Sequence, residues 1–142
     1  MRFNHKKAGW LRRIIVVSGM FIAAPAWASC PAVVDTTVIA ATPGLTLTIT
    51  VDKSGAKPGD VLLYILGFCN ASDAAISDLQ IDGATPTSTD FVSASCGELP
   101  PDIACIVSAQ PAPGDGGILT WMLTGALPPG ASGTVNFKVS VR

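Results

Sequence analysis

Strict alternation of apolar and polar side chains is the feature that most constrains what this chain can fold into. Residues 45–51 read LTLTITV, with an apolar residue at every odd position and threonine at every even one. Residues 134–142 read TVNFKVSVR and alternate in the same way. A β-strand sends successive side chains to opposite faces, so this period predicts strands with one buried and one solvated face, as in antiparallel sheets.

Five further segments have the composition of short strands, and clusters of turn-forming residues separate them. The segments are residues 61–70, 75–81, 90–95, 104–108 and 118–124. Because the chain carries 14 glycines and 11 prolines, no window supports a long helix. This spacing predicts an all-β fold, an immunoglobulin-like antiparallel β-sandwich of about seven strands over residues 45–142. The pattern leaves the strand order open.

The first 28 residues predict a secretory signal peptide, and residues 29–44 an extended N-terminal arm. Five of the nine basic residues lie in the first segment, which continues with an apolar run and the small residues of Ala26-Trp27-Ala28. The apolar run, residues 14–24, is shorter than the roughly 20 residues that a membrane-spanning helix needs. We therefore expect cleavage after Ala28, export to the periplasm, cell surface or extracellular space, and no transmembrane helix in the mature chain.

Two other interpretations of the export signal stay open. Arg12-Arg13 resembles the centre of a twin-arginine signal, although the flanking pattern is loose. Cys30 has a position at which a mature lipoprotein begins, but Trp27 stands where a lipoprotein signal carries an aliphatic residue. Lipidation of Cys30 would also leave one cysteine of the mature chain without a partner.

The composition of the mature chain excludes several classes of function. Residues 29–142 contain four basic and ten acidic side chains, a net charge of 4 − 10 = −6, which would repel nucleic acids and anionic lipid surfaces. The only histidine, His5, lies in the signal segment, so the mature chain has no Ser/His or Cys/His pair and no histidine to ligate a metal. We expect a protein that is not an enzyme and has no cofactor.

Binding of calcium by the aspartates of predicted turns and strand ends is left open by the sequence. These residues are Asp82, Asp90, Asp102 and Asp115. Aspartates in such segments are mostly solvated turn formers.

The mature chain has four cysteines, and their even number in an exported protein predicts two disulfides. They are Cys30, Cys69, Cys96 and Cys105, and three pairings are possible. We prefer Cys96–Cys105, because the intervening segment GELPPDIA is rich in turn formers and closes a short loop. That choice leaves Cys30 for Cys69. The spacings lack the short Cys-x-x-Cys pairs that zinc sites usually use.

Two predicted strands are apolar on both faces rather than on one. Residues 61–70 and 118–124 carry apolar side chains at positions where a half-buried strand would be polar. These outward residues are Val61, Leu63, Ile65, Ile118 and Met122. Because a soluble monomer rarely exposes a large apolar patch, the five residues form a candidate interface.

Three coverings for the second face of residues 61–70 are open. The arm could fold back over its own domain, held by a Cys30–Cys69 bond. Another protein or another copy could cover the face, with the arm of one subunit adding as a donor strand to the next. The strand could also be central in its sheet, with loops supplying the cover.

Several short motifs, in their order and spacing, resemble a single copy of the bacterial domain-of-unknown-function 11 repeat, over roughly residues 45–141. The matching residues are Pro58-Gly59-Asp60, Tyr64, Asn70, Asp82, Phe91-Val92-Ser93, Trp121, Leu123, Leu127 and Pro129-Gly130. The resemblance implies an immunoglobulin-like sandwich of a kind that occurs in tandem arrays in surface proteins, and it implies no catalytic residues. This chain differs from the family in its single copy, its four cysteines and its arm.

The function that these observations favour is a non-catalytic exported surface or structural module that acts by protein–protein contact or adhesion. The alternative is a subunit of an extracellular filament or surface assembly that uses the arm as a donor strand. Carbohydrate binding needs exposed aromatic rings, whereas all five rings of the mature chain occupy inward positions: Tyr64, Phe68, Phe91, Trp121 and Phe137. We expect a protein partner or self-association at the cell surface.

Overall fold

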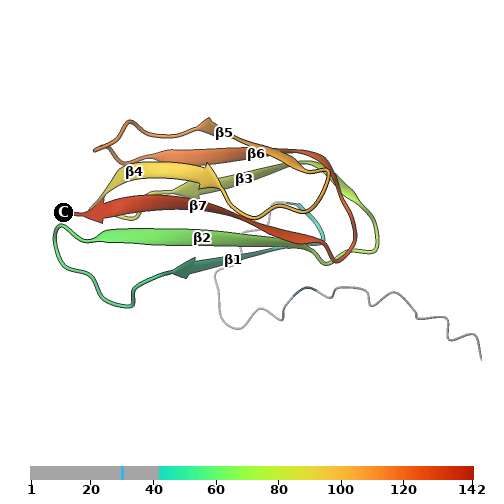
Figure 1. Ribbon diagram of the computed structural model, residues 1–142, viewed down its shortest axis with the longest axis horizontal. Helices are drawn as coiled ribbons and strands as arrows, with labels where there is room; N and C mark the ends of the chain where they lie inside the picture. Colours follow the sequence, from blue (N-terminus) through green and yellow to red (C-terminus); the bar gives the residue numbers. More distant parts are fainter. Residues whose placement is uncertain (1–29, 31–41) are drawn as a thin grey trace, which may run out of the picture.

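The structure, a computed structural model, describes Cys30 and residues 42–142 (Figure 1). Its seven strands are β1 (Leu45–Val51), β2 (Val61–Asn70), β3 (Ile76–Ala84), β4 (Thr89–Cys96), β5 (Ala104–Ala109), β6 (Ile118–Leu127) and β7 (Ser132–Val141). No helix occurs among the described residues, so the all-β prediction is confirmed. The predicted signal peptide and the arm residues 29 and 31–41 lie outside the described part of the chain.

The strands form two antiparallel sheets that pack into a sandwich (Figure 1). One sheet has four strands in the order β1-β2-β7-β4, and the other has three in the order β3-β6-β5. The constant-type immunoglobulin sandwich has the same division into four and three strands. In that sandwich the fifth strand lies inside the four-stranded sheet and the seventh lies at an edge of the three-stranded sheet. Here the two positions are exchanged, so β7 lies inside the four-stranded sheet and β5 lies at an edge.

The core lies between the sheets and follows the alternation of the sequence. On β7, Val135, Phe137 and Val139 are at most 1% exposed, whereas the intervening residues face outward. Trp121 on β6 is fully buried, and its indole Nε1 donates a hydrogen bond of 3.2 Å to the carbonyl oxygen of Ser95 on the opposite sheet. The largest side chain of the core therefore has a polar partner across the sandwich.

The prediction that all odd residues of β1 face the core is wrong for its second half. Ile49 and Val51 are 46% and 41% exposed, although Leu45 is buried. The four-stranded sheet is one strand wider than its partner, and β4 is joined to β5 by a disulfide. Among the described strands, none is therefore left to lie opposite β1. Alternation identifies the side of β1 that points toward the other sheet. It cannot show that no described strand lies opposite that side.

Three of the four edge strands are interrupted by a β-bulge or irregularity. The register shifts lie between Ser77 and Leu79 on β3, between Phe91 and Ser93 on β4, and between Val107 and Ala109 on β5. Bulges of this kind discourage a further strand from pairing with a sheet edge. The fourth edge strand, β1, pairs with β2 along its whole length without a shift.

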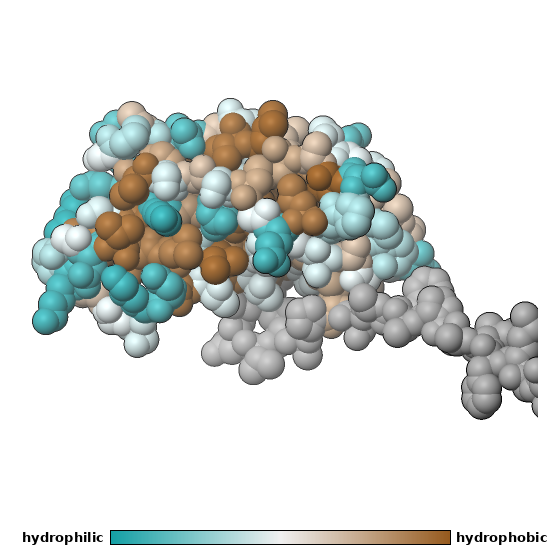
Figure 2. Space-filling model, in the orientation of Figure 1, coloured by the Kyte–Doolittle hydropathy of each residue, from teal (hydrophilic) through white to brown (hydrophobic). Residues whose placement is uncertain are grey.

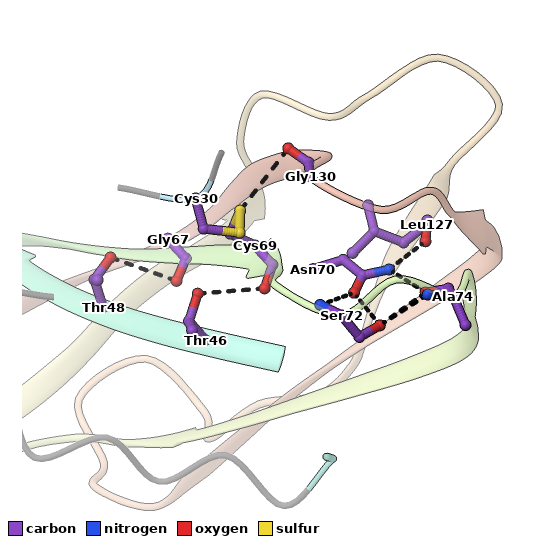
Figure 3. The surroundings of a disulfide bond; sticks show 10 residues. All are labelled: Cys30, Thr46, Thr48, Gly67, Cys69, Asn70, Ser72, Ala74, Leu127 and Gly130. Atoms are coloured by element: carbon purple, nitrogen blue, oxygen red, sulfur yellow. Dashed lines mark hydrogen bonds between the residues drawn. A yellow bond between two sulfur atoms is a disulfide. The ribbon is translucent and has the colours of Figure 1, made fainter. Parts of the chain in front are cut away.

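Asn70, the last residue of β2, joins three segments at one end of the sandwich (Figure 3). Its side chain is completely buried, and its Nδ2 donates to the carbonyl oxygens of Ala74, at 2.7 Å, and Leu127, at 2.9 Å. Its Oδ1 accepts from the backbone nitrogen and the hydroxyl of Ser72. Every polar atom of the amide therefore has a protein partner, and Asn70-Ala71-Ser72 does not present a free amide for glycosylation.

Replacing Asn70 with alanine should lower the free energy of unfolding by about 2–3 kcal/mol, because it leaves the carbonyl oxygen of the buried residue Leu127 without its side-chain donor and removes the acceptor of the Ser72 N–H. The measurement is urea denaturation of the oxidised protein. Asn136→Ala is the matched control, since that half-buried amide on the outer face accepts a surface bond from the Ser95 hydroxyl. We expect the control to change stability by less than about 0.5 kcal/mol, and equal losses in the two variants would contradict the role given to Asn70.

Candidate interaction surface

The outer face of the four-stranded sheet carries an apolar row on a central strand. We call Val61, Leu63 and Ile65 of β2 the β2 stripe. Their neighbours along the strand, including Leu62 and Leu66, are buried in the core, so the stripe points to the opposite side. Val61 is 44% exposed, and Leu63 and Ile65 are half-buried.

Polar side chains flank the β2 stripe on both neighbouring strands. Thr50 of β1 lies opposite Ile65, while Lys138 and Asn136 of β7 lie opposite Leu63 and Ile65. Figure 2 shows hydrophobic residues gathered over part of the sandwich with hydrophilic residues between and around them. An apolar centre with a polar rim is the usual arrangement of a protein interface.

Two open hollows lie along the outer face and meet at Thr134. One, of about 530 Å³, is lined by Leu63 and Ile65 of the stripe together with the start of the β4–β5 connection at Gly97 and Glu98. The other, of about 180 Å³, lies over Gly67. A Cβ at Gly67 would lie 2.6 Å from the Thr48 hydroxyl, so a larger residue there would displace that hydroxyl and fill part of the hollow.

The disulfide between Cys30 and Cys69 closes one end of this face (Figure 3). Cys69 is 4% exposed and lines the hollow over Gly67. Its Sγ lies 3.9 Å from the carbonyl oxygen of Gly130, a van der Waals contact since a disulfide sulfur carries no hydrogen. The bond fixes residue 30 beside the end of β2, and it is the pairing that remained after Cys96–Cys105 was assigned from sequence.

The second disulfide, Cys96–Cys105, joins β4 to β5 and therefore joins the two sheets. Its cysteines are nine positions apart, and the pairing is the one that the turn-rich segment between them favours. Together the two bonds indicate an oxidising environment, extracellular or periplasmic. Between residues 42 and 142, and at Cys30, the structure contains no helix that is long and apolar enough to cross a membrane.

The five residues of the candidate interface do not lie together. Ile118 and Met122 are on β6, on the outer face of the three-stranded sheet, whereas the β2 stripe is on the opposite side of the sandwich. Ile118 is 68% exposed, and Thr120, whose hydroxyl bonds Asp82, separates it from Met122 along the strand. One partner surface cannot cover both groups.

Sequence reasoning did not single out two further exposed apolar residues. Val92, 40% exposed, sits at the bulge of β4, and Ile106, 62% exposed, lies opposite Met122 on β5. Alternation around the buried Phe91 was the signal that could have placed Val92 on the outer face. For Ile106 the sequence had no equivalent landmark, because no residue of β5 is fully buried.

The four aspartates considered for calcium do not gather into one group in the described part of the chain. Asp82 accepts hydrogen bonds from Gln80 and Thr120 on the three-stranded sheet, and Asp90 pairs with Arg142 at 2.6 Å on the other. No group of three or more histidine, cysteine, aspartate or glutamate side chains suited to a metal occurs in the part of the chain that the structure describes.

Comparison with known proteins found no matching family model, no matching curated protein and no matching solved structure. The resemblance to the domain-of-unknown-function 11 repeat therefore stays a prediction from the motifs.

Removing the two disulfides should destabilise the protein to different extents. The Cys30–Cys69 bond closes a loop with a separation of 39 residues and the Cys96–Cys105 bond one of nine. Chain entropy then predicts losses of about 4 kcal/mol for Cys30→Ala with Cys69→Ala, and about 3 kcal/mol for Cys96→Ala with Cys105→Ala. Denaturant unfolding of the two double variants measures both. A larger loss for the short loop would mean that packing around the bond outweighs loop entropy.

Proposed function

We propose that this protein is a non-catalytic exported module that acts by binding another protein through the outer face of its four-stranded sheet. The observation that carries the proposal is the β2 stripe, which places half-exposed aliphatic residues on a central strand beside an open hollow. The polar flanks Thr50, Asn136 and Lys138 would form the rim. An isolated apolar residue on a surface needs no explanation, but a row beside a hollow with a polar rim has the features of an interface.

The rigidity of this face supports the same function. The stripe sits on a strand that is hydrogen-bonded on both sides, by β1 and by β7. A disulfide holds the end of that strand at Cys69. Binding residues on such a scaffold lose little conformational entropy when a partner docks. The two disulfides also fit a module that works outside the reducing cytoplasm.

Site-directed photo-crosslinking in cells that export the protein tests the proposal. A crosslinking residue at position 63, within the stripe, should give a discrete adduct with a partner protein. The same residue at position 118 is the matched control, since Ile118 is exposed on the opposite sheet. Adducts of equal yield from both positions would contradict a specific role for the outer face.

Competition with purified protein makes the test specific. Wild-type protein and the Ile118→Glu variant should suppress the adduct equally. Leu63→Glu should need about tenfold more protein, a loss of ~1.4 kcal/mol in binding. Near-ultraviolet circular dichroism checks that both variants are folded. Suppression by Leu63→Glu at the wild-type concentration would refute the proposed surface.

The second candidate function is a subunit of an extracellular assembly in which the arm of one copy adds to the sheet of the next. The observation that favours it is β1, an edge strand in perfect register with β2 and without a bulge. Addition of an extended strand to such an edge is an established mode of recognition. Light scattering on the purified protein separates the two functions, because donor-strand assembly requires a mass above that of one chain.

A further inference from the structure

The larger hollow on the outer face follows β7. Its floor consists of outward residues of that strand, Thr134, Asn136 and Lys138. Leu63 and Ile65 of the β2 stripe line one side, and the end of β4 with the connection that follows lines the other. β7 is hydrogen-bonded to both β2 and β4, so the two sides of the hollow are held at fixed positions. Its volume of about 530 Å³ is within the range of ligand-binding clefts.

Hydrogen bonds also fix the side of the hollow that β4 forms. The Asn136 Oδ1 accepts from the Ser95 hydroxyl at 2.7 Å, which turns this amide toward β4. The Thr134 hydroxyl accepts from the N–H of Glu98 at 2.9 Å, and the Thr134 N–H donates to the carbonyl oxygen of Glu98 at 2.7 Å. The backbone of Glu98 is therefore held beside Thr134, at one end of the hollow.

The two ends of the hollow carry opposite charges. Lys138 is exposed at one end, and Glu98 is exposed at the other. Because Glu98 is bonded to Thr134, four residues from Lys138 on β7, the two charged residues are about 13 Å apart along the strand. Among the residues that the structure describes, the one ion pair joins Arg142 to Asp90, so neither Lys138 nor Glu98 has an ionic partner there.

Two carboxylates on neighbouring strands are already engaged by other groups. Asp52 lies across Leu63 from Lys138, and its Oδ1 accepts the Leu63 N–H at 2.9 Å. Asp90 of β4, beside the end of β7, pairs with Arg142 at 2.6 Å. The ammonium group of Lys138 therefore has more to gain from a carboxylate that a binding partner brings.

We propose that the larger hollow binds an extended segment of the partner protein that has an acidic residue at one end, an apolar residue in the middle and a basic residue at the other end. The inference rests on the proposed function of this face. The acidic side chain would lie against Lys138 and the basic one against Glu98. The apolar one would lie against Ile65, which is opposite Asn136 and so midway between the two charges.

The distance between the charges sets the spacing within the segment. Alternate side chains of an extended chain face the same side, and two residues advance the chain by about 6.6 Å. A span of about 13 Å therefore corresponds to four residues. The partner segment should read acidic-x-apolar-x-basic, in either direction. Charge complementarity of this kind fixes register and rejects like charges more than it adds affinity.

This chain does not carry such a segment itself. In the sequence of 142 residues, no acidic residue lies four positions from a basic one. A second copy therefore cannot supply the segment as one extended stretch, and the occupant that the hollow fits is a different protein.

Competition for the adduct formed from position 63 tests the assignment, with purified full-chain variants in oxidised form as competitors. Lys138→Glu and Glu98→Lys should each need at least about fivefold more protein than wild type to suppress the adduct, because each brings like charges together at one end. The double variant should compete no better than either single variant, since it keeps the wild-type net charge but reverses the polarity of the hollow.

The matched controls make the same charge changes away from the hollow. Lys57→Glu, in the β1–β2 connection, and Asp115→Lys, in the β5–β6 connection, alter exposed residues and should compete like wild type. Near-ultraviolet circular dichroism checks that all the variants are folded. Mass spectrometry of the crosslinked peptide should find the acidic-x-apolar-x-basic spacing in the partner.

Several results would overturn the inference. If both single variants compete like wild type while the adduct from position 63 is present, the charged ends have no role and the proposed function stands. A gain in one single variant with a loss in the other would mean that net charge governs binding. A crosslinked peptide without the spacing, a crosslink within the chain or an adduct with the mass of two copies would assign the hollow to another occupant. Absence of any adduct would refute the proposed function, and this inference with it.

Discussion

The structure depends on the packing of two sheets of unequal width against each other. Trp121 occupies the centre of this contact, and its bond to Ser95 joins the three-stranded sheet to the four-stranded one. With β4 held over β5 by a disulfide, the extra strand of the wider sheet is β1. The exposure of Ile49 and Val51 follows from that difference in width.

The same sheet therefore offers two distinct surfaces. Its outer face presents the side chains of the β2 stripe, with the two hollows beside them. Its edge at β1 presents mainly backbone N–H and C=O groups, which favour pairing with an extended segment over docking of a folded partner. The Cys30–Cys69 bond lies where the face and the edge come together, so the start of the described chain is anchored next to both.

Much of the fold could be predicted from local sequence, because alternation reports directly on which side of a strand is buried. The predicted strand at residues 61–70 coincides with β2, and the inward positions of β7 are the buried ones. Strand order could not be predicted, since it depends on contacts between segments far apart in the chain. The overhang of β1 and the separation of Ile118 from the β2 stripe both depend on that order. For the candidate site, the sequence identified the apolar residues but could not divide them between two faces.

The position of β7 between β2 and β4 has a consequence for how the protein comes to be folded. β7 is the last of the seven strands to be synthesised, so Leu62 of β2 can pair with Val139 only after the other six strands have been made. Until β7 emerges, the four-stranded layer is split into β1-β2 and a lone β4, because β7 supplies the hydrogen bonds that join them. The native four-stranded sheet can therefore form only once the last of the seven strands has been synthesised.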